Sequence, residues 1–340
     1  MVRILQVIFA VVLLHGSARG SLQIEFDYTY DTANFFSAEH SDRRITLERA
    51  AELFESRILD DFAAINPAGG DTWTLSFPHP STGEIVFLQD LSLPKSTIRI
   101  FVGARDLPGN VLGYSEFNYS WSAATSGFFN MFSARTSTTN FDSLGGSISF
   151  DTNTPFYFDE DPSTLEPFFG QNDFYSLAVH EIGHLLGISA SVSAFHAATK
   201  SGEFVGAAAS TFFGGPVPLA PDLTHVKQGT VSHGQESAMM LANQGVRRTF
   251  SELDFAILQD IGYEIKLPEP VFRLLVPVPQ PDGKLVLSWT GGGGPFQIQS
   301  RASMLAPWMN LGTSTSDRNS IVDATAAHAF FRVVDLGRHP

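Results

Sequence analysis

Apolar residues recur at helical spacing in three places along the chain. The first stripe predicts a helix over Thr46–Ala64 and comprises Leu47, Ala50, Ala51, Phe54, Ile58 and Phe62. A second helix is predicted from a cap at Asn172 or Asp173 through Leu186, and a third over Ser251–Ile261 behind two overlapping capping-box patterns. A glycine follows each of these two helices, where a left-handed residue commonly ends a helix.

Short runs that favour β-structure lie between the first and second helices. These runs are Glu84–Leu88, Thr97–Val102, Val111–Tyr114 and Ser147–Phe150, and we expect them to form one sheet. Ser120–Ser143 is rich in Ser, Thr, Ala and Asn and predicts a surface loop. Ile188–Thr224 is rich in Ala, Gly, Ser and Pro and predicts a second loop.

The pattern changes at Leu267, where several prolines are followed by alternating runs separated by glycine and Asp/Asn turns. The runs are Lys284–Trp289, Phe296–Ser300 and Ala329–Val334. We therefore expect an α+β domain over residues 21–266, with a mixed twisted sheet, followed by a small all-β sandwich domain over residues 267–340.

The N-terminus has the order of a secretory signal. Arg3 precedes the apolar run Ile4–Leu14, and Ala18-Arg19-Gly20 offers a small-residue cleavage site. The run is too short to cross a hydrocarbon core, which needs about 20 residues, so a permanent membrane anchor is the weaker alternative. Residues 1–20 are thus predicted to be a signal peptide and the protein to be secreted or exported, without stable membrane insertion.

The charge and the cysteine content restrict the partners and the chemistry. The chain has 35 Asp+Glu and 21 Lys+Arg, a formal net charge of −14, which disfavours binding to nucleic acid and to anionic membranes. It has no cysteine, so disulfides and thiolate metal sites are excluded. Any metal site must use histidines and carboxylates.

The second predicted helix carries two histidines that suit one metal ion. His180 and His184 are four residues apart, so both imidazoles lie on one helix face. Glu181 lies about 100° further around the helix, where it can meet a water at the metal's open position rather than occupy a ligand site. This arrangement indicates zinc-assisted hydrolysis with Glu181 as general base. The alternative is a chance H-E-x-x-H pattern, against which the cap, the apolar lead-in and the terminal glycine argue.

The segment from His180 to Gly187 resembles the zinc helix of the metzincin metallopeptidases, whose longer pattern is H-E-x-x-H-x-x-G-x-x-H. The third ligand of that pattern falls on Ala190, which cannot bind metal. The resemblance therefore extends to matrixin-like or leishmanolysin-like bacterial members that carry an insertion before the third zinc ligand. It implies an exported zinc endopeptidase with a polypeptide substrate and a catalytic domain over residues 21–266.

Three downstream histidines compete for the third ligand position. His225 is preferred because its Asp-x-x-His setting resembles the ligand segment of members with such an insertion, His233 is the runner-up, and His196 is a minor candidate. In the family a methionine turn lies beneath the zinc, and Met239 and Met240 resemble it. Plain core packing is the alternative for these methionines.

The resemblance also gives expectations about the substrate. Val111, Leu112, Gly113 and Tyr114 resemble the exposed edge strand above the cleft, along which a peptide would add as a further strand. Leu253–Tyr263 resembles the closing helix of the family. The oligomeric state stays open.

Two further alternatives remain at this point. The acidic run Asp159–Asp161 has the ligands that Ca²⁺ prefers, although such runs are more often solvated turns. The rival function is a non-catalytic secreted adhesion or carbohydrate-binding protein with a relic zinc helix. Ala190 favours that rival, whereas an intact Glu181 favours the enzyme.

Overall fold

The computed structural model describes residues 22–164, 166–241, 244–268, 273–324 and 330–336. The chain divides into two compact units, Met1–Lys266 and Leu267–Pro340. The predicted signal peptide, residues 1–20, lies outside the described residues. Within the described part of the chain, no helix is long and apolar enough to cross a membrane.

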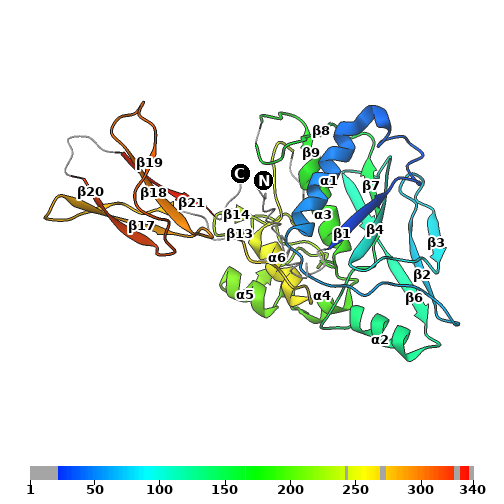
Figure 1. Ribbon diagram of the computed structural model, residues 1–340. Helices are drawn as coiled ribbons and strands as arrows, with labels where there is room; N and C mark the ends of the chain where they lie inside the picture. Colours follow the sequence, from blue (N-terminus) through cyan, green and yellow to red (C-terminus); the bar gives the residue numbers. More distant parts are fainter. Residues whose placement is uncertain (1–21, 165, 242–243, 269–272, 325–329, 337–340) are drawn as a thin grey trace, which may run out of the picture. The chain divides into compact units, whose positions relative to one another are not determined.

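A four-stranded sheet forms the centre of the first unit (Figure 1). Its strands, in spatial order, are β1 (Gln23–Asp27), β4 (Thr97–Arg105), β7 (Gly146–Asp151) and β5 (Gly113–Glu116). The first three are parallel, and β5 pairs antiparallel with β7, with Gly113 opposite Phe150. This places β5 at the edge of the sheet, with β7 as its single partner strand among the described residues.

The expectation of one sheet is wrong for the run near residue 85. That run, β3 (Ile85–Gln89), pairs with β2 (Thr72–Pro78) in a second, antiparallel sheet completed by β6 (Asn118–Ser122). β2 alternates buried Trp73, Leu75 and Phe77 with more exposed polar residues. This alternation is the period-2 signal that would have identified the missing strand.

The expectation of a surface loop over Ser120–Ser143 is also wrong, because this stretch contains α2 (Ser126–Arg135). The Thr125 hydroxyl caps the helix by accepting a hydrogen bond from the Phe128 N–H. Phe128 and Phe132 are buried one turn apart against the second sheet. Abundant small polar residues concealed this short apolar repeat.

The three predicted helices are present, with one boundary error. α3 (Phe174–Leu185) is capped by Asp173, and α6 (Glu252–Asp260) begins with a capping box. α1 (Ser41–Glu55) starts and ends earlier than the predicted Thr46–Ala64. After α1 the backbone pairs with the end of the unit, and Lys266 N donates to Arg57 O at 2.7 Å, so the helix cannot continue.

Residues 188–224 are more ordered than the predicted loop. They include α4 (Ser193–Ala197), α5 (Ala207–Phe213) and a small sheet of β10 (Thr199–Lys200), β11 (Glu203–Phe204) and β12 (Val217–Pro218). The amides of Ala208 and Ala209 donate to the Asp260 carboxylate of α6, which fixes α5 to the main body of the unit. The remaining short elements are a 3-10 helix (Ala38–His40), β8 (Phe156–Tyr157), β9 (Asn172–Asp173), β13 (Val231–Ser232) and β14 (Gln235–Glu236).

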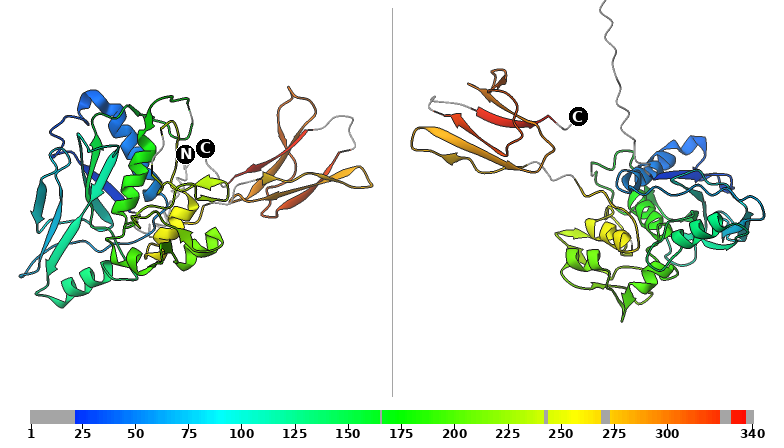
Figure 2. Two further views of the ribbon diagram at one scale, coloured as in Figure 1. Left: turned by 180° about the vertical axis from the view of Figure 1, so that it is seen from behind. Right: turned by 60° about the horizontal axis from the view of Figure 1, so that its bottom comes forward.

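The main core lies between the central sheet and the helices α1 and α3, which pack against each other (Figures 1 and 2). Aromatic side chains dominate it, and Phe36, Phe150 and Phe174 contact one another with ring centroids 4.6 to 6.2 Å apart. All three are fully buried. This packing holds α3, the helix with the histidines, firmly in the body of the unit.

The second unit is built mostly of β-strands. One sheet contains β15 (Arg273–Leu274), β16 (Val278–Pro279), β17 (Lys284–Thr290) and β20 (Asn319–Asp323), and the other contains β18 (Phe296–Arg301), β19 (Met309–Asn310) and β21 (Phe330–Asp335). All pairs are antiparallel. Both sheets contribute to one small core of Leu287, Trp289, Phe296, Ile298, Val322 and Val333.

Candidate metal centre

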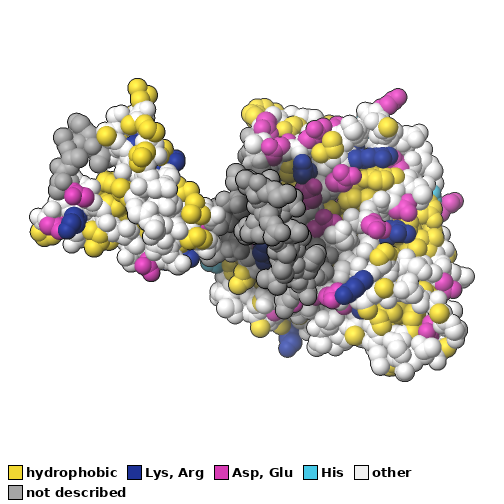
Figure 3. All heavy atoms as spheres, in the orientation of Figure 1, with side chains coloured by type: hydrophobic (Ala, Val, Ile, Leu, Met, Phe, Trp, Pro, Cys, Tyr) yellow, Lys and Arg dark blue, Asp and Glu magenta, His cyan; other side chains and the backbone are white. Residues whose placement is uncertain are grey.

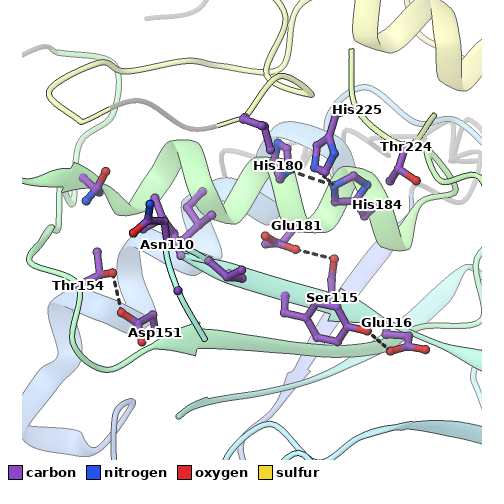
Figure 4. A pocket seen from close by; sticks show the side chains of 18 of the residues that line it. Asn110, Ser115, Glu116, Asp151, Thr154, His180, Glu181, His184, Thr224 and His225 are labelled. Atoms are coloured by element: carbon purple, nitrogen blue, oxygen red, sulfur yellow. Dashed lines mark hydrogen bonds between the residues drawn. The ribbon is translucent and has the colours of Figure 1, made fainter. Parts of the chain in front are cut away.

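Two imidazoles on α3 lie on the same face of the helix. His180 and His184 direct their Nε2 atoms toward one another, and these atoms are 3.0 Å apart (Figure 4). The Asp173 carboxylate accepts from Ser176 N at the start of α3, and Gly187, at φ +111°, follows its end. The caps therefore fix the length and the position of the helix that carries both histidines.

A third imidazole reaches the same point from the segment between β12 and β13. The Nε2 of His225 is 3.3 Å from the Nε2 of His184, and one ring nitrogen from each of the three histidines lies within 4.8 Å of the other two. Asp222 shapes this segment, because its Oδ1 accepts from the backbone amides of Thr224 and His225. The structure thus brings together three histidines that could hold a metal ion.

Each of these imidazoles is anchored through its other nitrogen. His180 Nδ1 donates to Ala238 O and His184 Nδ1 donates to Ile188 O, both at 2.7 Å. His225 Nδ1 lies 2.8 Å from Asp222 Oδ2. Because a carbonyl oxygen can only accept, the proton is on Nδ1 and the Nε2 lone pair is free to bind a metal.

Burial favours the neutral form of the two helix histidines. It lowers the pKa of His180 to about 4 and the pKa of His184 well below its usual range. Neutral imidazole is the form that binds metal ions. Both residues are thus in the ligand form at neutral pH.

The nitrogen spacing fits a four-coordinate metal ion. Ligand nitrogens about 2.0–2.1 Å from a tetrahedral zinc would lie about 3.3–3.4 Å apart, and the observed Nε2 separations along the cluster are 3.0 and 3.3 Å. Imidazole ligands suit zinc, copper, iron and nickel. The cluster could therefore hold a transition metal through three protein nitrogens and leave a position open.

Glu181 lies beside this cluster and against the edge strand. Its side chain is buried, and its Oε2 accepts from the Ser115 hydroxyl of β5 at 2.6 Å (Figure 4). Burial raises the pKa of Glu181 to about 7, although the hydrogen bond from Ser115 opposes the shift. Ser115 was not singled out in the sequence; it is two residues from Gly113 and so faces the same side of β5.

A cleft of about 1140 Å³ runs between β5 and α3. Residues 109–117 line one side of it, and His180, Glu181, His184 and His225 line the other. Gly113 and Tyr114 belong to β5 itself, whereas Val111 and Leu112 lie in the segment that leads into the strand. The three imidazoles and the carboxylate thus face a space large enough for a chain of several residues.

The other two candidate histidines lie outside the cluster. The ring of His233 contacts Phe212, with centroids 4.5 Å apart, and its Nδ1 is 3.1 Å from the Ser232 hydroxyl. His196 is exposed on α4. Ala190, where the compact motif has its third ligand, donates its N–H to Thr224 Oγ1 at 3.4 Å. The chain therefore returns to the position of the missing ligand one residue before His225.

The turn that contains the two methionines supports the cluster from below. Met239 and Met240 are buried, and a β-carbon on Gly183 of α3 would be 2.6 Å from Met239 Sδ. The preceding residue, Ala238, supplies the carbonyl that holds His180. The turn therefore both packs against α3 and orients one imidazole.

A buried carboxylate of α6 holds this turn in place. Asp254 accepts hydrogen bonds from Ser237 Oγ and Ala238 N, and also from Ser251 N and Oγ. Burial raises its pKa, while the hydrogen bonds oppose the shift. Asp254 belongs to one of the two predicted capping-box patterns, Ser251-x-x-Asp254, but nothing in the sequence indicated its contact with residues 237 and 238.

The acidic run Asp159–Asp161 does not gather further metal ligands among the described residues. Asp159 forms a buried ion pair with Arg247 at 2.7 Å, and Asp161 accepts from the backbone and the hydroxyl of Ser163. Asp159 is therefore buried in an ion pair rather than solvated, and these contacts give no support to calcium.

Comparison of this chain with known proteins found no match among protein-family models, curated proteins or solved structures. The functional argument therefore depends on the site itself.

Proposed function

We propose that this protein is an exported zinc endopeptidase of the metzincin type, with residues 21–266 as its catalytic domain and 267–340 as a small β-sandwich. The observation that carries the proposal is the convergence of His180, His184 and His225 beside Glu181, in a cleft bordered by an edge strand. Three imidazoles with an open fourth position are the ligand set of a catalytic zinc, whereas structural zinc sites use four protein ligands.

The three histidines would hold the zinc through their Nε2 atoms. A zinc ion so bound lowers the pKa of a water molecule to about 7 and polarises the scissile carbonyl. Glu181 is adjacent to His180 in the chain and faces the same cleft, so it would take the proton from the attacking water and pass it to the leaving amine. Ser115 would hold the carboxylate of Glu181 through the 2.6 Å hydrogen bond.

The polypeptide substrate would lie along β5. This strand is paired with β7 on one side only among the described residues, so its backbone groups on the cleft side can pair with an extended peptide. The peptide would then pass directly over Glu181 and the histidines.

The site also bears on the rival function of a non-catalytic binding protein. That alternative depended on the missing ligand at Ala190, and the position of His225 next to His184 supports the enzyme instead. A purely structural metal would need no carboxylate directed at its open position.

The decisive experiment measures zinc and peptidase activity in parallel. We expect one zinc per purified wild-type chain, loss of zinc in His225→Ala, and retention of both zinc and activity in His233→Ala, the matched control outside the cluster. Glu181→Gln should keep the zinc and lose about 10²- to 10⁴-fold in kcat/KM on a peptide library. A wild-type chain that binds no zinc after reconstitution, or an active Glu181→Gln variant, would overturn the proposal.

A further inference from the structure

The loop between β18 and β19 exposes large apolar side chains at its tip. Leu305 is 98% exposed, Met304 65% and Met309, at the start of β19, 63%. In Figure 1 this loop projects from the second unit, and in Figure 3 its tip is apolar. Single exposed apolar residues are common on protein surfaces, but an adjacent pair at the end of a projecting loop points to a binding function.

The loop is held in shape by its own hydrogen bonds. Arg301 Nη1 donates to Met304 O at 2.8 Å, and Ala306 N donates to Ser303 O at 3.2 Å. These bonds satisfy backbone groups near the tip and leave the Leu305 side chain fully exposed, while Met304 stays largely exposed with its Sδ accepting from Arg301 Nη2 at 3.7 Å. The apolar pair is therefore presented by an ordered turn.

Two arginines surround the tryptophan at the base of the loop. The guanidinium carbons of Arg301 and Arg332 lie 4.4 and 4.5 Å from the centroid of the Trp308 ring. Arg332 is positioned by a 2.7 Å hydrogen bond from its Nε to Gln299 Oε1. With its π-system engaged by two cations, Trp308 is poorly placed to stack on a sugar ring, which argues against a carbohydrate ligand.

The charge of this region differs from the charge of the whole chain. Residues 267–340 contain 6 Lys+Arg and 5 Asp+Glu, whereas residues 22–266 contain 13 and 30. Residues 296–311 and 330–335, which form the loop and the strands around it, contain two arginines and one acidic residue, Asp335, which pairs with Phe296 at the end of the strands away from the loop. The general repulsion from anionic surfaces thus applies to the first unit, and the loop is locally cationic.

We propose that this loop, residues 302–308, docks the protein reversibly on an anionic lipid surface. Met304 and Leu305 would enter the boundary between headgroups and acyl chains. Trp308 would lie at headgroup level, where amphipathic rings concentrate, and Arg301 and Arg332 would face lipid phosphates. A protein partner would not require this combination of a narrow aliphatic tip, an interfacial tryptophan and two cations behind it. Docking of this kind does not depend on the proposed peptidase activity.

The test measures binding of the full chain to vesicles by co-sedimentation. We expect the wild type to bind phosphatidylcholine vesicles that contain phosphatidylglycerol and to bind pure phosphatidylcholine vesicles more weakly. Leu305→Asp should lower the partition coefficient about tenfold or more, because it removes the most exposed apolar side chain from the inserted tip. Arg332→Gln should reduce the preference for phosphatidylglycerol.

The matched control is Val276→Asp, an aliphatic residue of the same unit that is 87% exposed and lies outside the loop. It should bind as the wild type does, and equal thermal unfolding of all variants would show that the fold is intact. The proposal is overturned if the wild type stays in the supernatant with both vesicle types. It is also overturned if Val276→Asp loses as much binding as Leu305→Asp, or if Leu305→Asp binds like the wild type.

Discussion

Gly113 of β5 and Glu181 of α3 lie so close together that a β-carbon at position 113 would be 2.6 Å from Glu181 Oε1. The absence of a side chain at this position lets the edge strand run directly beside the zinc helix proposed here. The carboxylate then fills the space, with Ser115 as its hydrogen-bond donor from the same strand. The position of the edge strand and the position of the Glu181 side chain therefore depend on one another sterically.

Gly113→Ala should therefore impair catalysis more than metal binding. The added methyl group must displace the Glu181 side chain, while the three histidines are not among its nearest neighbours. We expect kcat/KM to fall about tenfold or more, since a displacement of about 1 Å at a catalytic group can cost 10²-fold, and zinc content to stay at one per chain. Gly127→Ala, which meets no atom within 4 Å, is the control and should match the wild type. An unchanged kcat/KM in Gly113→Ala would show that the close contact has no role.

Asp222 should control metal affinity although it is not itself a ligand. It holds His225 through Nδ1 at 2.8 Å and shapes the turn through the amides of Thr224 and His225. Loss of such an outer-shell partner weakens metal binding by about 10- to 100-fold. We expect this loss in Asp222→Ala and a smaller one in Asp222→Asn, which keeps an acceptor oxygen, as measured by competition with a chromogenic chelator. Equal affinities of wild type and Asp222→Ala would contradict the role.

Gly183→Ala should destabilise the protein through the methionine turn. The new β-carbon would be 2.6 Å from Met239 Sδ and 2.8 Å from Phe250 Cε2, both in the core. Overpacking of this kind lowers the free energy of unfolding by about 1–3 kcal/mol. The better helix propensity of alanine offsets up to about 1 kcal/mol of this loss. We expect a lower Tm by differential scanning calorimetry, with Gly127→Ala again as the control. A Tm equal to that of wild type would contradict this prediction, because it would mean that the methionine turn can shift to admit the methyl group without loss of stability.

The helices that carry the site could be predicted because their signals are local. Asp173 and Gly187 mark the two ends of α3, and Ser251 with Asp254 marks the start of α6. Such caps act within a few residues of themselves, so the sequence alone reveals them. α2 escaped prediction because its apolar repeat is only one turn long, and the β2–β3–β6 sheet because strand pairing is not a local property.

The sequence limited the third histidine of the cluster to three candidates but did not decide among them. His225 follows His184 by 41 residues, and no spacing rule operates across an insertion of that length. Its position depends on the hydrogen bond from Val226 N to Met239 O and on the contact of Ala190 with Thr224, both of which are tertiary contacts. The hydrogen bond between Ser115 and Glu181 likewise exists only because β5 and α3 are neighbours in space.

A carboxyl group far along the chain from the histidines should make stability depend on pH. Burial raises the pKa of Asp60 from 3.8 to about 7, and the negative charges of Asp142 and Glu264 add to this, although the Glu264 N–H donates to Asp60 Oδ2 at 2.8 Å. Because the folded-state pKa exceeds the unfolded one, the folded protein retains a proton between about pH 4 and 7 that the unfolded chain has lost. This stabilisation is complete below pH 4 and is lost as the pH rises to 7.

Asp60→Asn should therefore gain stability relative to wild type as the pH increases. Asparagine keeps the acceptor for the Glu264 amide and carries no charge, so the difference in unfolding free energy between variant and wild type should rise between pH 5 and 7 and then level off. Urea unfolding of both proteins at several pH values, with equal metal content, measures this difference in unfolding free energy. The control is Asp61→Asn, which loses a surface ion pair with Lys95 and should show no such rise, because the pKa of Asp61 is lowered rather than raised. A difference for Asp60→Asn that stayed constant across this range would contradict the prediction, because it would mean that the pKa of Asp60 is the same in the folded and the unfolded protein.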